Sequence, residues 1–306
     1  MSPECTVAVR FHPPPAELQR YFTTFYRADI AVPEGGRVTD QIQPEWANLR
    51  FITGSPVETE TLDGTRLCDL QFIATGPSKR AVRFSMGTAR IWGIGLLPLG
   101  WVKFVGPPAD GSADAVTDGF ADPMFAGFTG LARQLIDQSD DDDACLAAIT
   151  RHFSAYADDP VPDEDRITAI HEAVIDPDVA TVSELVARVG AAQRTVERLC
   201  DRAFGFAPKR LLRRQRFMRS LAQFMLDPSL KWIGAIDGAY HDQAQFVRDF
   251  HEFMGTTPSE YAANPHPILG AFMRERARVA GAAVQTLDPP AGGGSPRPVA
   301  GDGPSP

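Results

Sequence analysis

Residues 177–262 contain a regular succession of signals for the start and the end of helices. Thr181-Val-Ser-Glu184 and Thr257-Pro-Ser-Glu260 both have the pattern of a capping box, in which a hydroxyl and a carboxylate satisfy free amides of the first helical turn. A glycine such as Gly190 permits the sharp turn that ends a helix. This part of the chain is therefore expected to fold as short helices joined by tight turns.

The first two helices are predicted over residues 181–189 and 192–203. The second of them has apolar residues at i, i+3, i+4 and i+7, which indicates one buried face. The opposite, polar face carries Arg194, Glu197, Arg198 and Asp201. Two helices joined by a short turn, the second with an arginine-bearing face, form the helix-turn-helix arrangement that places one helix in the major groove of DNA. There Arg198 can bond a guanine edge, and Arg194 can bond a base or a phosphate.

The same pattern recurs after residue 226. Asp227-Pro228 supplies an N-cap and a first-turn proline, and a short helix then carries Leu230, Ile233 and Ile236. Gly238 marks a turn, and the helix after Asp242 buries Phe246, Phe250 and Phe253. Pro208–Met225 joins the two units as a helix of roughly 27 Å. Recognition helices that enter successive major grooves lie about 34 Å apart, so a linker of this length suits two helix-turn-helix units on one DNA.

Charge separates this region from the rest of the chain. The net charge is −9, but residues 1–180 sum to −13 and residues 181–306 to +4. Thr181–Leu226 holds ten basic and three acidic side chains, which is the electrostatic footprint expected for phosphate contact. Residues 227–261 sum to −4. We therefore expect phosphate contacts mainly from the first unit and the linker, including Arg202, Arg213 and Arg214. The second unit either reads few bases or faces a protein such as RNA polymerase.

These features together resemble the AraC/XylS family of bacterial transcription regulators. The resemblance covers about residues 178–262 and rests on GAYHDQAQFVRDFHEFMGTTPSEY, from Gly238 to Tyr261, and on RTVERLCDRAFGFAPKRLLRRQR, from Arg194 to Arg216. The chain departs from the family at Ala192, where a capping Ser is usual, at Cys200, which replaces a Phe, and at Ala239, which replaces a turn Gly. By position, the resemblance implies DNA contacts from Arg194, Glu197, Arg198, Gln243, Gln245 and Arg248.

The rest of the chain divides into three parts. Residues 1–120 contain short β-branched and aromatic runs broken by Gly and Pro, which predict a β-sandwich or barrel, with strands at Val7–Phe11, Phe22–Ile30, Leu49–Phe51, Val82–Phe84 and Ala89–Ile94. Residues 121–176 form a helical connector with helices at 124–137, 142–156 and 163–175. After the DNA-binding region (177–264), residues 265–306 begin with a helix and end in a disordered tail rich in Gly and Pro.

The β-rich part resembles, more loosely, the sensor domains attached to some regulators of this family, through Gly76-Pro77 and the stretch from Gly93 to Gly119. Such a domain binds a small effector, dimerises, or does both. No effector-binding residue can be named from the sequence. Trp46, Trp92 and Trp101 are large enough to line a pocket, but ordinary core packing is the favoured interpretation of each.

Several functions are excluded by what the sequence lacks. The longest apolar stretch, Ile91–Val102, has 12 residues, against about 20 needed to cross a bilayer, and the N-terminus has no secretory signal, so we expect a cytoplasmic protein. The four cysteines are scattered, and His12 alone lies in the β-rich part, which disfavours a metal site or an oxygenase. No G-x-S-x-G element or P-loop is present.

The sequence therefore predicts an α+β protein without catalytic residues, metal or cofactor. Its N-terminal β-sandwich or barrel would act as a sensor, and its C-terminal all-α domain would hold two helix-turn-helix units. We expect a sequence-specific DNA-binding transcriptional regulator, an effector-responsive activator whose partners are double-stranded DNA, a small-molecule effector, RNA polymerase and a second copy of the chain. The alternative is a protein-interaction module with a degenerate helix-turn-helix domain, which the acidic second unit suggests.

Overall fold

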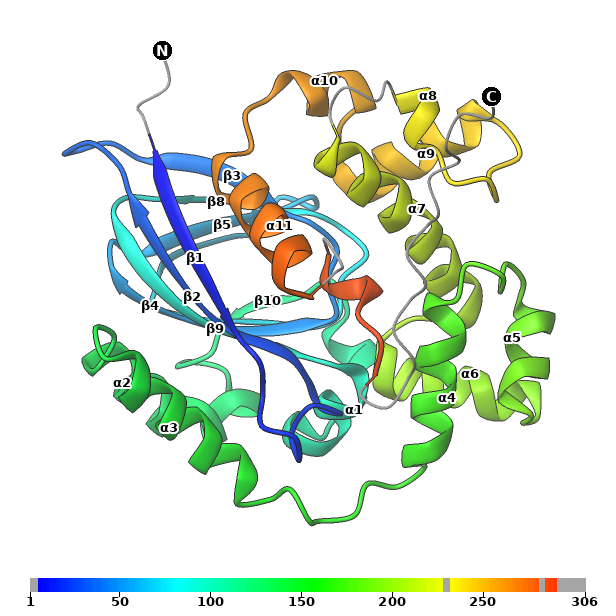
Figure 1. The fold of residues 1–306 in the computed structure, drawn as a ribbon, viewed down its shortest axis with the longest axis horizontal. Coiled ribbons are helices and arrows are strands. Elements are labelled where there is room, and N and C mark those ends of the chain that lie inside the picture. Colours follow the sequence, from blue (N-terminus) through cyan, green and yellow to red (C-terminus); the bar gives the residue numbers. More distant parts are fainter. Residues whose placement is uncertain (1–4, 228–231, 281–283, 291–306) are drawn as a thin grey trace, which may run out of the picture.

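The computed structural model describes residues 5–227, 232–280 and 284–290. A β-rich N-terminal part stands beside a helical C-terminal part, which confirms the predicted α+β architecture (Figure 1). The strands are β1 (Thr6–His12), β2 (Phe22–Ala31), β3 (Val38–Ile42), β4 (Ala47–Gly54), β5 (Val57–Thr61), β6 (Arg66–Leu70), β7 (Phe72–Thr75), β8 (Val82–Met86), β9 (Ala89–Leu96) and β10 (Val116–Asp118).

Two antiparallel sheets form a sandwich. One has the order β1-β2-β9-β4-β7-β10 and the other β3-β8-β5-β6. Alternate side chains of each strand point between the sheets, as the period of two requires, so that residues such as Ile30, Ile52 and Met86 form a shared core. The five predicted strands correspond to β1, β2, β4, β8 and β9. The short strands β3, β5, β6, β7 and β10 were not predicted.

The first two helices of the connector lie beneath the six-stranded sheet, and its third helix packs against the C-terminal helices (Figure 1). Its helices are α2 (Thr129–Asp137), α3 (Asp142–Ser154) and α4 (Glu164–Ile175), and they follow the turns α1 (Pro98–Gly100), η1 (Trp101–Val105), η2 (Ala109–Ser112) and η3 (Pro123–Phe128). An acidic cap begins α3, because the Asp141 carboxylate accepts a hydrogen bond from the Ala144 amide at 2.9 Å. One apolar core runs without interruption from this sheet face through α4 to the first helix-turn-helix unit.

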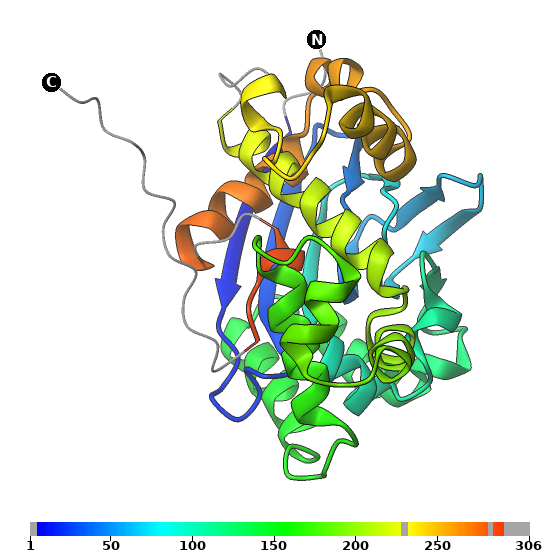
Figure 2. The same ribbon diagram turned by 90° about the vertical axis from the view of Figure 1, so that its right-hand side faces the viewer.

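The C-terminal helices follow the predicted order. They are α5 (Val182–Val189), α6 (Gln193–Phe204), α7 (Pro208–Leu226), α8 (Trp232–Ala235), α9 (Gln243–Met254), α10 (Pro258–Ala263) and α11 (Pro267–Ala280), followed by the turn η4 (Gln285–Leu287). Figure 2 shows α7 in front of the β-sandwich, running between the two helical units. Pro228 and Leu230, and the tail 291–306, lie outside the described residues, so their predictions remain untested.

Helix α11 leaves the helical part and returns to the β-sandwich. It packs on β1 and β3, which are edge strands of the two sheets (Figure 1). Its residues Ile268 and Phe272 belong to the core between the sheets, whereas Met273 joins the core of the second helical unit. The sequence predicted a helix here but gave no indication of where it would pack.

Candidate functional site

The first helical unit has the geometry of a helix-turn-helix. The Thr181 hydroxyl accepts from the Glu184 amide at 3.3 Å, and the Glu184 carboxylate accepts from the Thr181 amide at 2.9 Å, which completes the predicted capping box. Gly190 ends α5 with φ +66°, a left-handed conformation that favours glycine. Helix α6 then begins after Ala192, whose side chain supplies no cap. The turn therefore depends on Gly190 and on packing rather than on a capping serine.

One face of α6 is open to solvent. Val196, Leu199 and Cys200 are fully buried on the other face. Arg194 is exposed, and the side chain of Arg198 is 55% exposed, as a major-groove contact requires. Glu197, by contrast, is half-buried and accepts a hydrogen bond from Gln193 Nε2 at 2.8 Å. The predicted first-unit residues thus share one helix face, with the two arginines most accessible.

Asp163, at the start of α4, lies beside this face. Its carboxylate is 3.2 Å from Nη2 of Arg198 and 4.0 Å from Nη1 of Arg202. Hydrogen bonds from Arg198 and Arg166 hold the pKa of Asp163 below its usual value. Exposed ion pairs of this kind contribute about 0–1 kcal/mol, so a base edge or a phosphate of DNA can replace the carboxylate. Sequence analysis did not identify Asp163, because it lies 35 residues from its partner Arg198.

The position of Arg214 in the linker helix α7 shows that one prediction, its contact with DNA, is wrong. Arg214 is 0% exposed, so it cannot contact DNA in this arrangement. Its Nη1 donates to the Ser78 carbonyl at 3.0 Å, and its guanidinium lies 4.0 Å from the centroid of the Trp46 ring. Burial lowers the pKa of Arg214 to about 9. Arg214 therefore docks α7 on the β-sandwich, because the side of the helix on which it lies faces that domain.

The neighbouring Arg213 joins α7 to α9. Its Nη2 lies 2.6 Å from Asp249 and 2.6 Å from Glu252, and its side chain is 32% exposed. Asp249 is 1% exposed and also accepts a hydrogen bond from the Tyr240 hydroxyl at 2.9 Å. Arg216 completes this cluster at 3.4 Å from Asp249. A buried carboxylate thus fixes the second recognition helix to the linker.

Helix α9 presents the predicted second-unit residues. The Asp242 carboxylate caps it by accepting from the Gln245 amide at 2.6 Å. Gln243 and Arg248 are exposed, and Gln245 is half-buried. The buried face holds Phe246, Phe250 and Phe253, as the spacing predicts. The outward orientation expected for Asp249 from the sequence is wrong, because Asp249 lies three positions after Phe246 on this same buried face and is 1% exposed. The apolar periodicity is the signal that could have found it.

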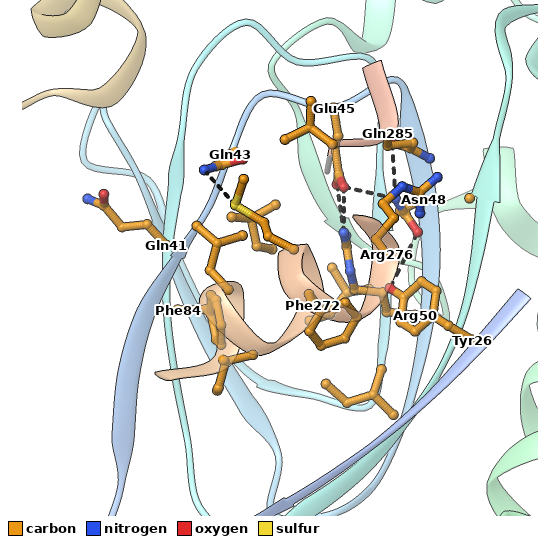
Figure 3. Close-up of a pocket in the computed structure, with 18 of the residues that line it drawn as sticks. Tyr26, Gln41, Gln43, Glu45, Asn48, Arg50, Phe84, Phe272, Arg276 and Gln285 are labelled. Atoms are coloured by element: carbon orange, nitrogen blue, oxygen red, sulfur yellow. Dashed lines mark hydrogen bonds and ion pairs between the residues drawn. The ribbon is translucent and has the colours of Figure 1, made fainter. Parts of the chain in front are cut away.

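A second candidate site lies between the two sheets, where the structure has a cavity of about 140 Å³ that is partly open to solvent (Figure 3). Most of its wall is apolar, including Ile52, Phe84 and Met86. At its polar end, Arg50 Nη2 lies 2.6 Å from Glu45 Oε2. Although burial opposes the charge of the guanidinium, Glu45 raises the pKa of Arg50, so the guanidinium remains charged.

The tryptophans do not line this cavity. Trp46, Trp92 and Trp101 are each 1% exposed and belong to the core on the other face of the six-stranded sheet. The favoured interpretation of ordinary packing is therefore confirmed for all three. Residues of the C-terminal segment do line the cavity, among them Phe272, Arg276 and Gln285 (Figure 3). Sequence analysis missed them because they lie more than 200 positions from the strands that they contact.

In the part of the chain that the structure describes, no group of three His, Cys, Asp or Glu side chains is arranged to hold a metal ion. Among the same residues, no helix combines the length and the apolar composition that a membrane span requires. Cys145 and Cys200 are buried free thiols, whereas Cys68 is exposed.

Comparison with known proteins agrees with the geometry of the C-terminal part. Residues 185–264 match a protein-family model described as a helix-turn-helix domain. No curated protein matches the chain at a significant level. Among solved structures, ToxT from Vibrio cholerae is 11% identical with a TM-score of 0.42, and the match covers 85% of this chain and 97% of ToxT. The AraC-like transcriptional activator CuxR is 15% identical with a TM-score of 0.25, over 71% of this chain and 87% of CuxR.

Proposed function

We propose that this chain is a sequence-specific activator that responds to a small molecule held between its two sheets. Its residues 185–264 match a helix-turn-helix domain of the AraC type, which supports a DNA-binding transcriptional regulator. The observation that carries this proposal is the exposure of Arg194 and Arg198 on α6 and of Gln243 and Arg248 on α9. Both helices bury their opposite faces, so these polar faces point away from the core, as entry into major grooves requires.

The acidic second unit does not oppose DNA binding. Asp237, Asp249 and Glu252 pair with arginines of the linker helix. Asp242 and Glu260 cap helices. These carboxylates therefore have structural roles, and linker arginines neutralise part of their charge. This favours DNA contact over the alternative of a degenerate domain that binds only proteins.

The cavity in the β-sandwich supports the effector part of the proposal. A ligand that prefers one conformation of the two-domain chain shifts the population toward that conformation. RNA polymerase and a second copy of the chain are the further partners of this proposal. ToxT has been solved with an unsaturated fatty acid bound, and the similarity to this chain is too weak to transfer that ligand.

Selection of bound fragments from the source genome by the purified full chain tests the DNA-binding role. We expect wild-type protein to enrich one sequence motif at moderate salt. Arg198→Ala should lose about 1–3 kcal/mol of affinity and relax the preference at one position of that motif.

The matched control is Arg188→Ala. Arg188 is an exposed arginine of α5 that pairs with Asp176 at 3.0 Å and lies outside the recognition helix. The Arg188→Ala variant should enrich the same motif as wild type. Failure of wild-type protein to enrich any motif at several salt concentrations would favour the protein-interaction alternative.

A further inference from the structure

We infer that the second helix-turn-helix unit reads thymine through its methyl group, with Val247 of α9 as the contacting residue, whereas the first unit reads G·C base pairs through charged side chains. This inference rests on the proposed sequence-specific DNA binding and names the class of DNA sequence that each unit takes. It depends on three features of the described residues: the equivalence of α6 and α9, the exposure of Val247, and the pairing of the carboxylates around it.

The two recognition helices have the same length and the same register. Helix α6 spans Gln193–Phe204 and α9 spans Gln243–Met254, so each position of α6 corresponds to the position of α9 that lies 50 residues later. The buried positions of the two helices agree under this offset. They are Val196, Cys200 and Ala203 in α6 and Phe246, Phe250 and Phe253 in α9. The outward positions can therefore be compared pair by pair.

The outward positions of the two helices differ in chemistry. The corresponding pairs are Arg194 and Ala244, Glu197 and Val247, and Arg198 and Arg248. One arginine is therefore present in both helices, but two charged residues of α6 are replaced by two apolar residues in α9. Because these positions lie opposite the buried face, the two helices present different groups to a major groove.

Val247 is an exposed apolar residue in the middle of this outward face. It is 36% exposed, and it is the only large apolar residue of either recognition helix, both fully described, that is exposed to this degree. Ala244, three positions earlier and therefore its neighbour on the helix surface, is also exposed. Single exposed apolar residues are common on protein surfaces, but this one lies on the face that enters the groove.

The major groove offers one apolar group to such a surface. Of the four bases, only thymine carries a methyl group there, and apolar side chains recognise this group by contact. Arginine instead bonds the edge of guanine, and glutamate accepts a hydrogen bond from the amino group of cytosine. Val247 therefore complements thymine, whereas Arg194, Glu197 and Arg198 of α6 complement G·C base pairs.

The carboxylates of α9 do not compete for the outward face. Asp249 and Glu252 each lie 2.6 Å from Nη2 of Arg213 in the linker helix α7. Arg248, next to Val247, is exposed and has no ion pair with any residue that the structure describes. The guanidinium of Arg248 can therefore bond a guanine or a phosphate while Val247 contacts a thymine in the same groove.

Uracil substitution in the selected DNA fragment tests the methyl contact with the full chain. Uracil pairs with adenine as thymine does and lacks only the methyl group. The base position at which Arg248→Ala relaxes the preference locates the half-site of α9, and Arg198→Ala locates that of α6. Uracil in place of thymine should weaken wild-type binding about fourfold at one or two positions of the α9 half-site, and less than twofold in the α6 half-site.

Val247→Ala assigns the uracil effect to this side chain. The variant should bind the thymine fragment about fourfold more weakly than wild type, and the further loss caused by uracil should fall below twofold. Its affinity for random DNA should equal that of wild type, which verifies that the variant is folded. The matched control is Val279→Ala, which shortens a valine of α11 that is 47% exposed and lies outside both recognition helices. This control should keep the full uracil effect.

Three outcomes would overturn this inference. They are an α9 half-site without thymine, equal uracil effects in the two half-sites, including none in either, and an undiminished uracil effect in Val247→Ala. Each of these outcomes leaves the proposed function intact, because the chain would still bind a specific sequence. A chain that binds no specific sequence would overturn the proposed function and this inference together.

Discussion

Acidification should lower the stability of the fold, because the unfolded chain binds a proton at His171 that the folded chain excludes. The imidazole is 2% exposed, and its ring centroid lies 5.3 Å from that of Trp46 and 6.2 Å from that of Phe204. Burial, reinforced by the charge of Arg214, lowers the pKa of His171 to about 3. The folded protein therefore holds this residue neutral over the whole physiological range.

The size of the effect follows from the two pKa values. In the unfolded chain His171 titrates near 6.5, so as pH falls the unfolded state takes up the proton first and stability is lost. Between pH 7 and pH 5 the loss from His171 alone is about 2 kcal/mol. Asp288 acts in the opposite direction, because burial raises its pKa to about 6 and the folded state gains about 1 kcal/mol over the same interval.

Urea unfolding of wild type and His171→Gln at pH 5, 6 and 7 separates the two contributions. Asp288 affects both proteins alike, so the difference in unfolding free energy between them reports His171. That difference should change by about 2 kcal/mol in favour of the variant as pH falls from 7 to 5. His251→Gln, at an exposed position of α9, is the control and should follow wild type. Parallel profiles for wild type and His171→Gln would refute the reasoning.

Three substitutions test individual contacts. Asp249→Asn should lower the free energy of unfolding in urea by about 3 kcal/mol, because two arginines of α7 lose their buried partner. Arg214→Met should keep specific DNA affinity within about twofold of wild type by fluorescence anisotropy, because this buried arginine neutralises no phosphate; a loss equal to that of Arg198→Ala would contradict its placement. Gly190→Ala should lower the free energy of thermal unfolding by about 1 kcal/mol, because an alanine at φ +66° is strained even though no atom lies within 4 Å of the added Cβ. No measurable loss would show that the turn relaxes.

The helices of the C-terminal part could be predicted because their signals are local. The capping box at Thr181 and the turn at Gly190 specify α5 within a few residues, and the predicted bounds of α5, α6 and α7 lie within a residue of the observed ones. The missed strands have weaker local signals. Strand β3, with the sequence VTDQI, has few apolar residues, and it forms because it pairs with β8, whose residues lie 40 to 48 positions from their partners in β3.

The site residues show the same limit. Arg213 and Arg214 are adjacent in sequence, yet one pairs with α9 and the other is buried against the sandwich, because successive residues of a helix point in different directions. A signal was present, since Arg214 lies three positions after Leu211 and four before Met218, both fully buried. The charge of the segment outweighed that periodicity in the prediction. No local sequence signal indicates that α11 packs on the β-sandwich.

The central claim is that both helix-turn-helix units read sequence. Fluorescence anisotropy titrations test it by comparing the selected DNA fragment with random DNA, for wild type, Arg198→Ala and Arg248→Ala. Each variant should lose about 1–3 kcal/mol on the selected fragment and much less on random DNA, with the relaxed preference at a different base position for each. Equal losses on selected and random DNA for either variant would contradict base reading by that unit.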